Sequence, residues 1–157
     1  MLIFISGSIN SGKTTTARIL AKRIGAANVN VDDLNDTIPN FDLAKDLDKS
    51  MDLAIKKINE YHSAGKDIVA NYVVREKDYL RFEKEVLATP LFVITLAPRL
   101  DIVQNQRGSR ILSDWEKTRI QYHYDTGIAS PYFGIIIDNS VLTAEQTVDR
   151  IVDIIKL

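Results

Sequence analysis

Short runs of apolar, mostly β-branched residues recur along the chain, and longer segments with helical periodicity separate them. The runs are nearly continuous rather than alternating between apolar and polar positions, which is typical of parallel strands covered on both faces. The pattern predicts five strands, at residues 2–5, 29–31, 67–73, 91–96 and 133–137.

The intervening segments carry apolar residues three and four positions apart, the spacing that places them on one face of a helix. The last of these helices has a clear start, because Thr143 and Gln146 have the spacing of a capping box. The pattern predicts helices at residues 14–24, 43–61 and 76–87 and from Thr143 onward.

Strands that alternate with helices predict a three-layer α/β sandwich, in which a five-stranded parallel sheet has helices on both faces. No repeat or Pro/Gly-rich linker divides the chain, so we expect one domain over residues 1–157. Ligands of such sheets bind at the carboxyl ends of the strands. The residues that follow each strand are therefore the candidates for a functional site.

Composition limits the classes of function. The formal charge of −1 over 157 residues disfavours a dedicated nucleic-acid binder, and the absence of cysteine excludes disulfides, thiolate metal sites and a cysteine nucleophile. The first apolar run is too short for a signal peptide, and the other apolar runs are too short for a membrane span, so we expect a cytoplasmic protein without a membrane partner. No feature indicates an oligomeric state.

The first strand leads into a glycine-flanked loop that ends in lysine and threonine. Residues 7–14, GSINSGKT, match the pattern G-x-x-x-x-G-K-[ST] of a P-loop, with a predicted strand before it and a helix after it. The backbone amides of such a loop bind phosphate, its lysine contacts the β- and γ-oxygens, and its threonine hydroxyl binds Mg²⁺. We therefore predict ATP and Mg²⁺ as cofactors, with Lys13 also catalytic and Thr14 a metal ligand. The predicted nucleotide-binding residues here are Gly7, Ser8, Asn10, Ser11, Gly12, Lys13, Thr14 and Thr15.

Two adjacent carboxylates follow the second strand, in the stretch NVNVDDLN. A carboxylate beside the γ-phosphate can orient or deprotonate an acceptor hydroxyl, or hold Mg²⁺ through water. An aspartate at this place can instead cap the next helix. We predict Asp32 as a catalytic residue and metal organiser and Asp33 as a substrate-binding residue.

The P-loop followed by paired aspartates resembles the small-molecule P-loop kinases, a group that includes shikimate kinase, gluconate kinase, chloramphenicol phosphotransferase and the kinase domain of polynucleotide kinase. The resemblance implies that Asp32 lies near the acceptor hydroxyl as a general base or Mg²⁺ organiser. Two departures count against shikimate as the acceptor. The aspartates are adjacent rather than spaced as D-x-D, and the third strand is followed by NYVV rather than by a glycine-rich stretch.

The third strand end supplies two further candidates for the acceptor site. Asn71 can hydrogen bond to a hydroxylated substrate, and Arg75 can pair with an anionic one. A solvated arginine at a helix start is the alternative for Arg75.

After the fourth strand, the resemblance implies a short lid at about residues 107–120. Guanidinium groups in a lid neutralise the charge that develops on a transferring phosphoryl group. The resemblance implies that Arg107 packs on adenine and that Arg107 and Arg110 are catalytic, with Arg119 as a further candidate. The alternative is that each is a charge on a helix surface.

The resemblance also implies that Asn139 and Ser140, after the fifth strand, meet the base of the nucleotide. Asp138 can fix that turn. For His123, and for Trp115 with its neighbouring tyrosines, we predict structural packing roles.

These residues support three hypotheses. The first is a kinase that transfers the γ-phosphoryl group of ATP to a hydroxyl of a small-molecule acceptor, with Asp32 positioning that hydroxyl. The second is a nucleoside, nucleotide or polynucleotide 5′-hydroxyl kinase, although the acidic charge makes a long nucleic acid an unlikely partner. The third is a nucleotide-binding regulator or slow ATPase without an acceptor.

Overall fold

The computed structural model describes residues 1–105 and 111–156 and confirms the predicted three-layer α/β architecture. Five strands form one parallel sheet of order β2-β3-β1-β4-β5. The strands are β1 (Leu2–Gly7), β2 (Ala27–Asn30), β3 (Ile68–Asn71), β4 (Leu91–Leu96) and β5 (Ile135–Ile137). The helices are α1 (Lys13–Ile24), α2 (Val31–Asn35), α3 (Leu47–Ser63), α4 (Glu76–Glu85), α5 (Leu100–Val103), α6 (Asp114–Asp125) and α7 (Ala144–Ile155).

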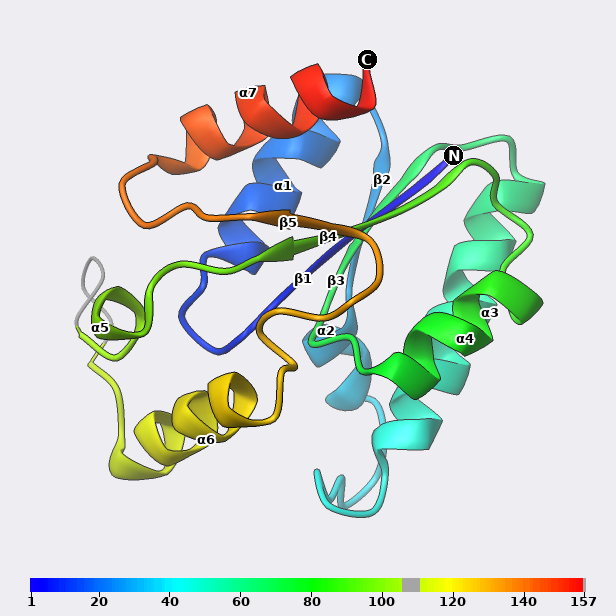
Figure 1. The fold of residues 1–157 in the computed structure, drawn as a ribbon. Helices are drawn as coiled ribbons and strands as arrows, with labels where there is room; N and C mark the ends of the chain where they lie inside the picture. Colours follow the sequence, from blue (N-terminus) through cyan, green and yellow to red (C-terminus); the bar gives the residue numbers. More distant parts are fainter. Residues whose placement is uncertain (106–110, 157) are drawn as a thin grey trace.

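Helices α1 and α7 cover one face of the sheet, and α3 and α4 cover the other (Figure 1). Successive residues of β1 point to opposite faces and therefore enter different cores. Phe4 packs with Phe82 of α4 on one side, and Ile5 packs with Leu20 of α1 on the other. Because both faces of β1 are buried, its sequence is continuously apolar, which is the pattern that predicted it.

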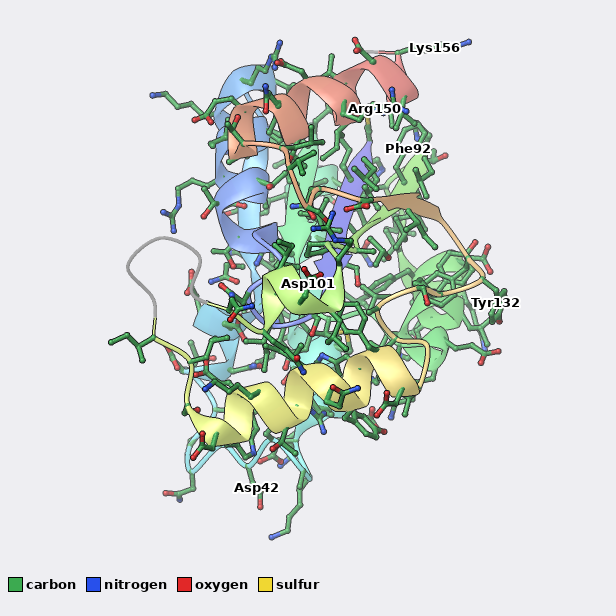
Figure 2. All side chains as sticks on the ribbon, turned by 60° about the vertical axis from the view of Figure 1, so that its left-hand side comes forward. Asp42, Phe92, Asp101, Tyr132, Arg150 and Lys156 are labelled. Carbon is green, nitrogen blue, oxygen red and sulfur yellow. The ribbon has the colours of Figure 1, made fainter. Side chains whose placement is uncertain are left out.

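Strand β1 lies at the centre of the sheet, in register with both neighbours. Phe4 pairs with Ala70 of β3 on one side and with Val93 of β4 on the other. The loop that follows β1 therefore emerges between the carboxyl ends of β3 and β4. Figure 2 shows α6 near this end of the sheet and α7 at the opposite end of the molecule.

Several element boundaries differ from the predicted ones. Strand β2 covers Ala27–Asn30 rather than residues 29–31, because α2 starts at Val31 with two aspartates in its first turn, where the helix dipole favours negative charge. Strand β3 ends at Asn71, and β5 covers only Ile135–Ile137. Helix α3 starts at Leu47 rather than at residue 43, because residues 42–46 form a turn in which the carboxylate of Asp46 accepts a hydrogen bond from the amide of Asp42.

Among the described residues, no helix is both long enough and apolar enough to cross a membrane.

The stacked pair Phe4 and Phe82 anchors α4 to the centre of the sheet. Both side chains are fully buried, with ring centroids 4.7 Å apart. We expect Phe82→Ala to lower the free energy of unfolding by about 3–5 kcal/mol, because the smaller side chain leaves a cavity against Phe4. Urea denaturation followed by circular dichroism measures this change. Leu80→Ala is the control, because Leu80 lies on the same helix with 54% of its surface exposed. Equal stability of the two variants would contradict the assigned packing.

Candidate functional site

The loop between β1 and α1 turns sharply at Gly7, where φ is +146°. A Cβ atom at Gly7 would lie 2.5 Å from Ser11 Oγ and 2.7 Å from the carbonyl oxygen of Leu96, so only glycine permits this approach. Gly12, with φ of +91°, is the N-cap of α1 and has no side chain with which to cap it. The first amides of a 12-residue helix therefore open into the turn, which is the arrangement that binds a phosphate.

Side-chain hydrogen bonds connect the loop to neighbouring segments of the chain. Asn10 donates from Nδ2 to the carbonyl oxygens of Val103 and Asn105, at 2.9 and 3.0 Å. From the other side, Asn139 Nδ2 donates to the carbonyl oxygen of Ser11 at 2.9 Å. The loop is thus fixed both to the end of α5 and to the segment after β5.

His123 of α6 makes a third attachment to this loop. Its Nδ1 atom is hydrogen bonded to Ser8 Oγ at 2.9 Å, and the side chain is 3% exposed. Burial lowers the pKa of His123 to about 4, and the positive charges of Arg119 and Lys13 contribute to the decrease. The imidazole is therefore neutral near pH 7. Its burial fits the structural role that we expected, but His123 also lines the cavity described next.

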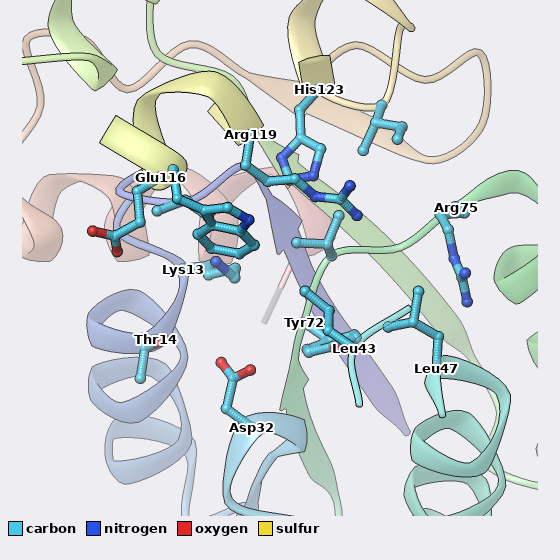
Figure 3. A pocket seen from close by; sticks show the side chains of 14 residues that line it. Lys13, Thr14, Asp32, Leu43, Leu47, Tyr72, Arg75, Glu116, Arg119 and His123 are labelled. Atoms are coloured by element: carbon cyan, nitrogen blue, oxygen red, sulfur yellow. The ribbon is translucent and has the colours of Figure 1, made fainter. Parts of the chain in front are cut away.

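A cavity of about 330 Å³ lies in front of the loop (Figure 3). Its walls come from the loop and the start of α1, from α2 and the start of α3, from the end of β3, and from α6. The lining residues are Ile9, Lys13, Thr14, Asp32, Leu43, Leu47, Tyr72, Val73, Arg75, Trp115, Glu116, Arg119, His123 and Ile128. The cavity therefore combines the residues expected to bind phosphate with the carboxylate expected to meet an acceptor.

A buried asparagine positions the carboxylate wall of the cavity. Asn71 is fully buried at the end of β3, and its Nδ2 atom donates to Asn30 Oδ1 at 2.8 Å and to Thr14 Oγ1 at 3.4 Å. Asn30 donates in turn to Asp33 Oδ1 at 2.7 Å. These contacts connect the ends of β2 and β3, fix the first turn of α2 and so present Asp32 to the cavity.

Tyr72 contributes a protonated hydroxyl beside this carboxylate. Burial raises the pKa of Tyr72, and the negative charge of Asp32 raises it further. The hydroxyl oxygen accepts a hydrogen bond from Asn35 Nδ2 at 3.3 Å. Tyr72 therefore stays neutral and holds the start of the β3–α4 connection against α2.

The structure brings some of the predicted site residues together and places others elsewhere. Lys13, Thr14, Asp32 and Arg75 share the cavity, whereas the carboxylate of Asp33 is directed to Asn30. The roles assigned to these residues stay predictions.

Arg75 reaches the cavity with its guanidinium already engaged. It forms a two-pronged ion pair with Asp78, with N–O distances of 2.6 and 2.8 Å, and lies 3.8 Å from Asp48. The carboxylate of Asp78 also accepts a hydrogen bond from the backbone amide of Arg75 and thereby caps the start of α4.

The predicted base-contacting residues lie behind the phosphate-binding loop. Asn139 is buried against Ser11, as described above. Ser140 accepts a hydrogen bond from the amide of Arg99 and donates to Asp138, which also accepts from the amide of Ser140 and thereby fixes the turn. The predicted lid residues Arg107 and Arg110 lie outside the described residues.

The packing role predicted for Trp115 is wrong. Its side chain is 59% exposed and lines the cavity, one helical turn from Arg119. The capping box of Ser113 and Glu116 could have located the start of α6 at Asp114, but it does not determine which face of the helix meets the cavity. The apolar wall residues Leu43 and Leu47 were expected only as part of a helix at residues 43–61.

The loop and its surroundings fit a nucleotide with Mg²⁺. Glycine at the N-cap of α1 leaves the first amides of the helix open, Lys13 supplies a positive charge, and Thr14 and Asp32 supply the oxygen donors that Mg²⁺ prefers. Lys13 Nζ donates to the carbonyl oxygen of Ser8 at 3.2 Å, which holds the ammonium group over the turn.

The sequence matches no protein-family model and no curated protein. Solved structures share its fold, however. A sugar kinase from Janibacter sp. HTCC2649 has a TM-score of 0.76 at 13% identity, over 99% of this chain and 94% of that one. Shikimate kinase from Acinetobacter baumannii, in complex with shikimate, has a TM-score of 0.68 at 15% identity, over 99% and 92%. A gluconokinase from Sinorhizobium meliloti 1021 has a TM-score of 0.67 at 14% identity, over 98% and 94%. The chain therefore has the fold of the P-loop small-molecule kinases.

The buried, neutral His123 makes the stability of the fold depend on pH. An unfolded histidine has a pKa of about 6.5, so between this value and about 4 the unfolded chain binds more protons than the folded one. We therefore expect stability to decrease as the pH falls from about 6.5 toward 4, with His123 contributing about 3 kcal/mol over this range.

His123→Asn should reduce this decrease, as measured by urea denaturation at several pH values. His62→Asn is the matched control, since His62 is the only other histidine of the chain and lies near the end of α3. If His123→Asn and His62→Asn show the same pH slope as the unaltered protein, the neutral state assigned to His123 is wrong.

Proposed function

We propose that this chain is an ATP-dependent kinase that transfers the γ-phosphoryl group to a hydroxyl of a small-molecule acceptor. The observation that carries the proposal is that Lys13, Thr14 and Asp32 line one cavity at the carboxyl end of the sheet. A phosphate-binding loop alone is compatible with many nucleotide-binding proteins. A carboxylate across the same cavity is what phosphoryl transfer to a hydroxyl requires.

Bound ATP with Mg²⁺ supplies the phosphoryl group and a divalent charge that neutralises it. The loop amides and the start of α1 bind the phosphates, and Lys13 contacts their β- and γ-oxygens. Thr14 would ligate the metal ion through its hydroxyl, to which Asn71 Nδ2 donates a hydrogen bond at 3.4 Å. These groups are fixed before binding, so little reorganisation is needed to stabilise the developing charge.

Asp32 acts on the acceptor. It orients the hydroxyl and accepts its proton while the hydroxyl oxygen bonds to the γ-phosphorus of ATP. The bond between that phosphorus and the bridging oxygen breaks, and ADP leaves with the electron pair. Asp32 then releases the proton to solvent.

Arg119 brings a positive charge into the cavity from α6. Its side chain lies beside His123 among the residues that line the cavity (Figure 3). Through this charge Arg119 assists Lys13 in stabilising the transferring phosphoryl group. The volume of about 330 Å³ favours a single small acceptor over an extended polymer, because it lies at the lower end of the range of small-molecule sites.

Lys13→Ala should abolish detectable ATP binding, because it removes the positive charge that contacts the β- and γ-phosphates. Isothermal titration calorimetry with Mg²⁺-ATP measures the binding. Lys22→Ala is the matched control, since Lys22 is exposed in the last turn of the same helix. Unchanged ATP affinity in Lys13→Ala would rule out the assigned phosphate site.

Asp32→Asn should keep ATP binding and lose phosphoryl transfer by about 10²–10⁴-fold, because the amide cannot accept the proton of the acceptor. Acceptors are found first, by measuring ADP release with Mg²⁺-ATP against sugars, polyols, nucleosides, aromatic alcohols and 5′-hydroxyl oligonucleotides. The rate is then compared between variants, with Asp36→Asn as the control from the exposed end of α2.

Two outcomes would contradict the proposal. ADP release that no acceptor accelerates would favour a nucleotide-binding regulator or slow ATPase. Full transfer by Asp32→Asn would show that another group meets the acceptor hydroxyl.

A further inference from the structure

We propose that the acceptor carries its hydroxyl on or next to a flat apolar ring, which stacks on the indole of Trp115 and against an aliphatic wall formed by Leu43, Leu47 and Val73. This inference rests on the proposed kinase function and specifies the class of its acceptor. The acceptors named for the structural neighbours, shikimate and sugars, have no such ring.

Helix α6 presents Trp115 to the cavity from a well-defined position. The capping box at Ser113 fixes the start of the helix, and Arg119 follows Trp115 by one turn on the same face. An indole with 59% of its surface exposed leaves a large apolar area in contact with water. Covering that area with a ligand ring releases this water and is favourable.

An aliphatic wall faces α6 across the cavity. Leu43 and Leu47 come from the chain before α3 and from its first turn, and Val73 follows β3. Figure 3 shows Leu43 and Leu47 on the side of the cavity opposite Arg119 and His123. The two walls together provide an apolar slot beside Asp32, so a ring held there carries its hydroxyl close to the carboxylate.

Several polar side chains of the cavity wall already have protein partners. Arg75 is paired with Asp78, the Tyr72 hydroxyl accepts from Asn35, and His123 is hydrogen bonded to Ser8. A polyhydroxylated acceptor needs a partner for each hydroxyl that it brings out of water, and each missing partner weakens binding. The engaged wall therefore disfavours a polyol and favours a ring with few polar groups.

The positive charges that line the cavity further limit the class of acceptor. Arg119 lines the cavity, and its guanidinium carbon lies 5.0 Å from the centroid of the Tyr122 ring on the same helix. A cationic acceptor would be repelled by Arg119 and Lys13. The expected acceptor is thus a neutral or anionic ring compound with a hydroxyl group.

Trp115 is the only tryptophan of the chain, so its fluorescence reports binding at this wall without requiring catalysis. We suggest titrating the full chain, without ATP, with two ring-bearing sets of probes: phenols (phenol and 4-methylphenol) and aromatic alcohols (2-phenylethanol and 3-phenyl-1-propanol). Gluconate, glucose and shikimate form the polyol set. At least one ring-bearing set should change the emission of Trp115 saturably, and the set that does so shows whether the hydroxyl lies on the ring or next to it. The polyols should not.

Variants of Trp115 distinguish the loss of ring stacking from a general loss of structure. Calorimetry with the best ring compound should show binding about tenfold weaker or more for Trp115→Ala and within about threefold for Trp115→Phe, which keeps an aromatic face. Tyr132→Ala is the control, because Tyr132 is exposed and lies outside the cavity. The fold of each variant is checked by circular dichroism.

The results distinguish this inference from the proposed function. Binding of polyols but not of ring compounds, or equal affinity of Trp115→Ala and the unaltered protein, would overturn the inference. Acceleration of ADP release by polyols alone would overturn it and leave the kinase function in place. Saturable binding of a ring compound that is lost in Trp115→Ala would support ring recognition, even if that compound failed to accelerate ADP release and so contradicted the kinase function.

Discussion

The close approach of backbone at Gly7 is the constraint on which the site depends. The chain leaves the central strand, turns against the carbonyl oxygen of Leu96 and returns as α1, and a Cβ at Gly7 would meet Ser11 and Leu96 inside van der Waals contact. A turn this tight directs successive amides toward one point. Because β1 is central, the elements that follow the neighbouring strands surround that point. The loop is braced by Asn10 and His123 and becomes the floor of the cavity.

Features of the fold and the site could be predicted from the sequence where the residues that cause them lie close together in the chain. Strands that are buried on both faces are mostly apolar, so β1 and β4 are evident in the sequence, whereas the partly exposed β2 starts two residues and ends one residue before the predicted bounds. The P-loop was predictable because its glycines and lysine follow a fixed local pattern. Asp32 could be placed because it lies two residues after the end of β2. The position of Trp115 depends on the phase of α6, a polar helix whose few apolar residues give a weak periodic signal, and so it was misjudged.

Tertiary contacts account for what local patterns could not predict. Asn71 was expected to meet the substrate, and its described contacts are to Asn30 and Thr14 from separate elements. Arg75 was expected to meet an anion, and its carboxylate partner, Asp78, lies three residues on in the same helix start. In both cases the residue type indicated a polar contact but not the partner of that contact. The partners of Asn71 were decided by the sheet order β2-β3-β1, which cannot be derived from single segments, whereas Arg75 pairs within its own helix start.

The charges around the cavity bear on which ligand groups it can stabilise. Burial and the charges of Arg119 and Lys13 keep His123 neutral, so that the histidine braces Ser8 without adding a third positive charge. Arg75 is paired with Asp78, so the charge of its guanidinium is balanced within the start of α4. Under the proposed function, Lys13 and Arg119 would stabilise the charge of a transferring phosphoryl group, whereas the aliphatic wall would favour an uncharged part of the acceptor. The phosphate and the acceptor would then bind to parts of one cavity that differ in polarity.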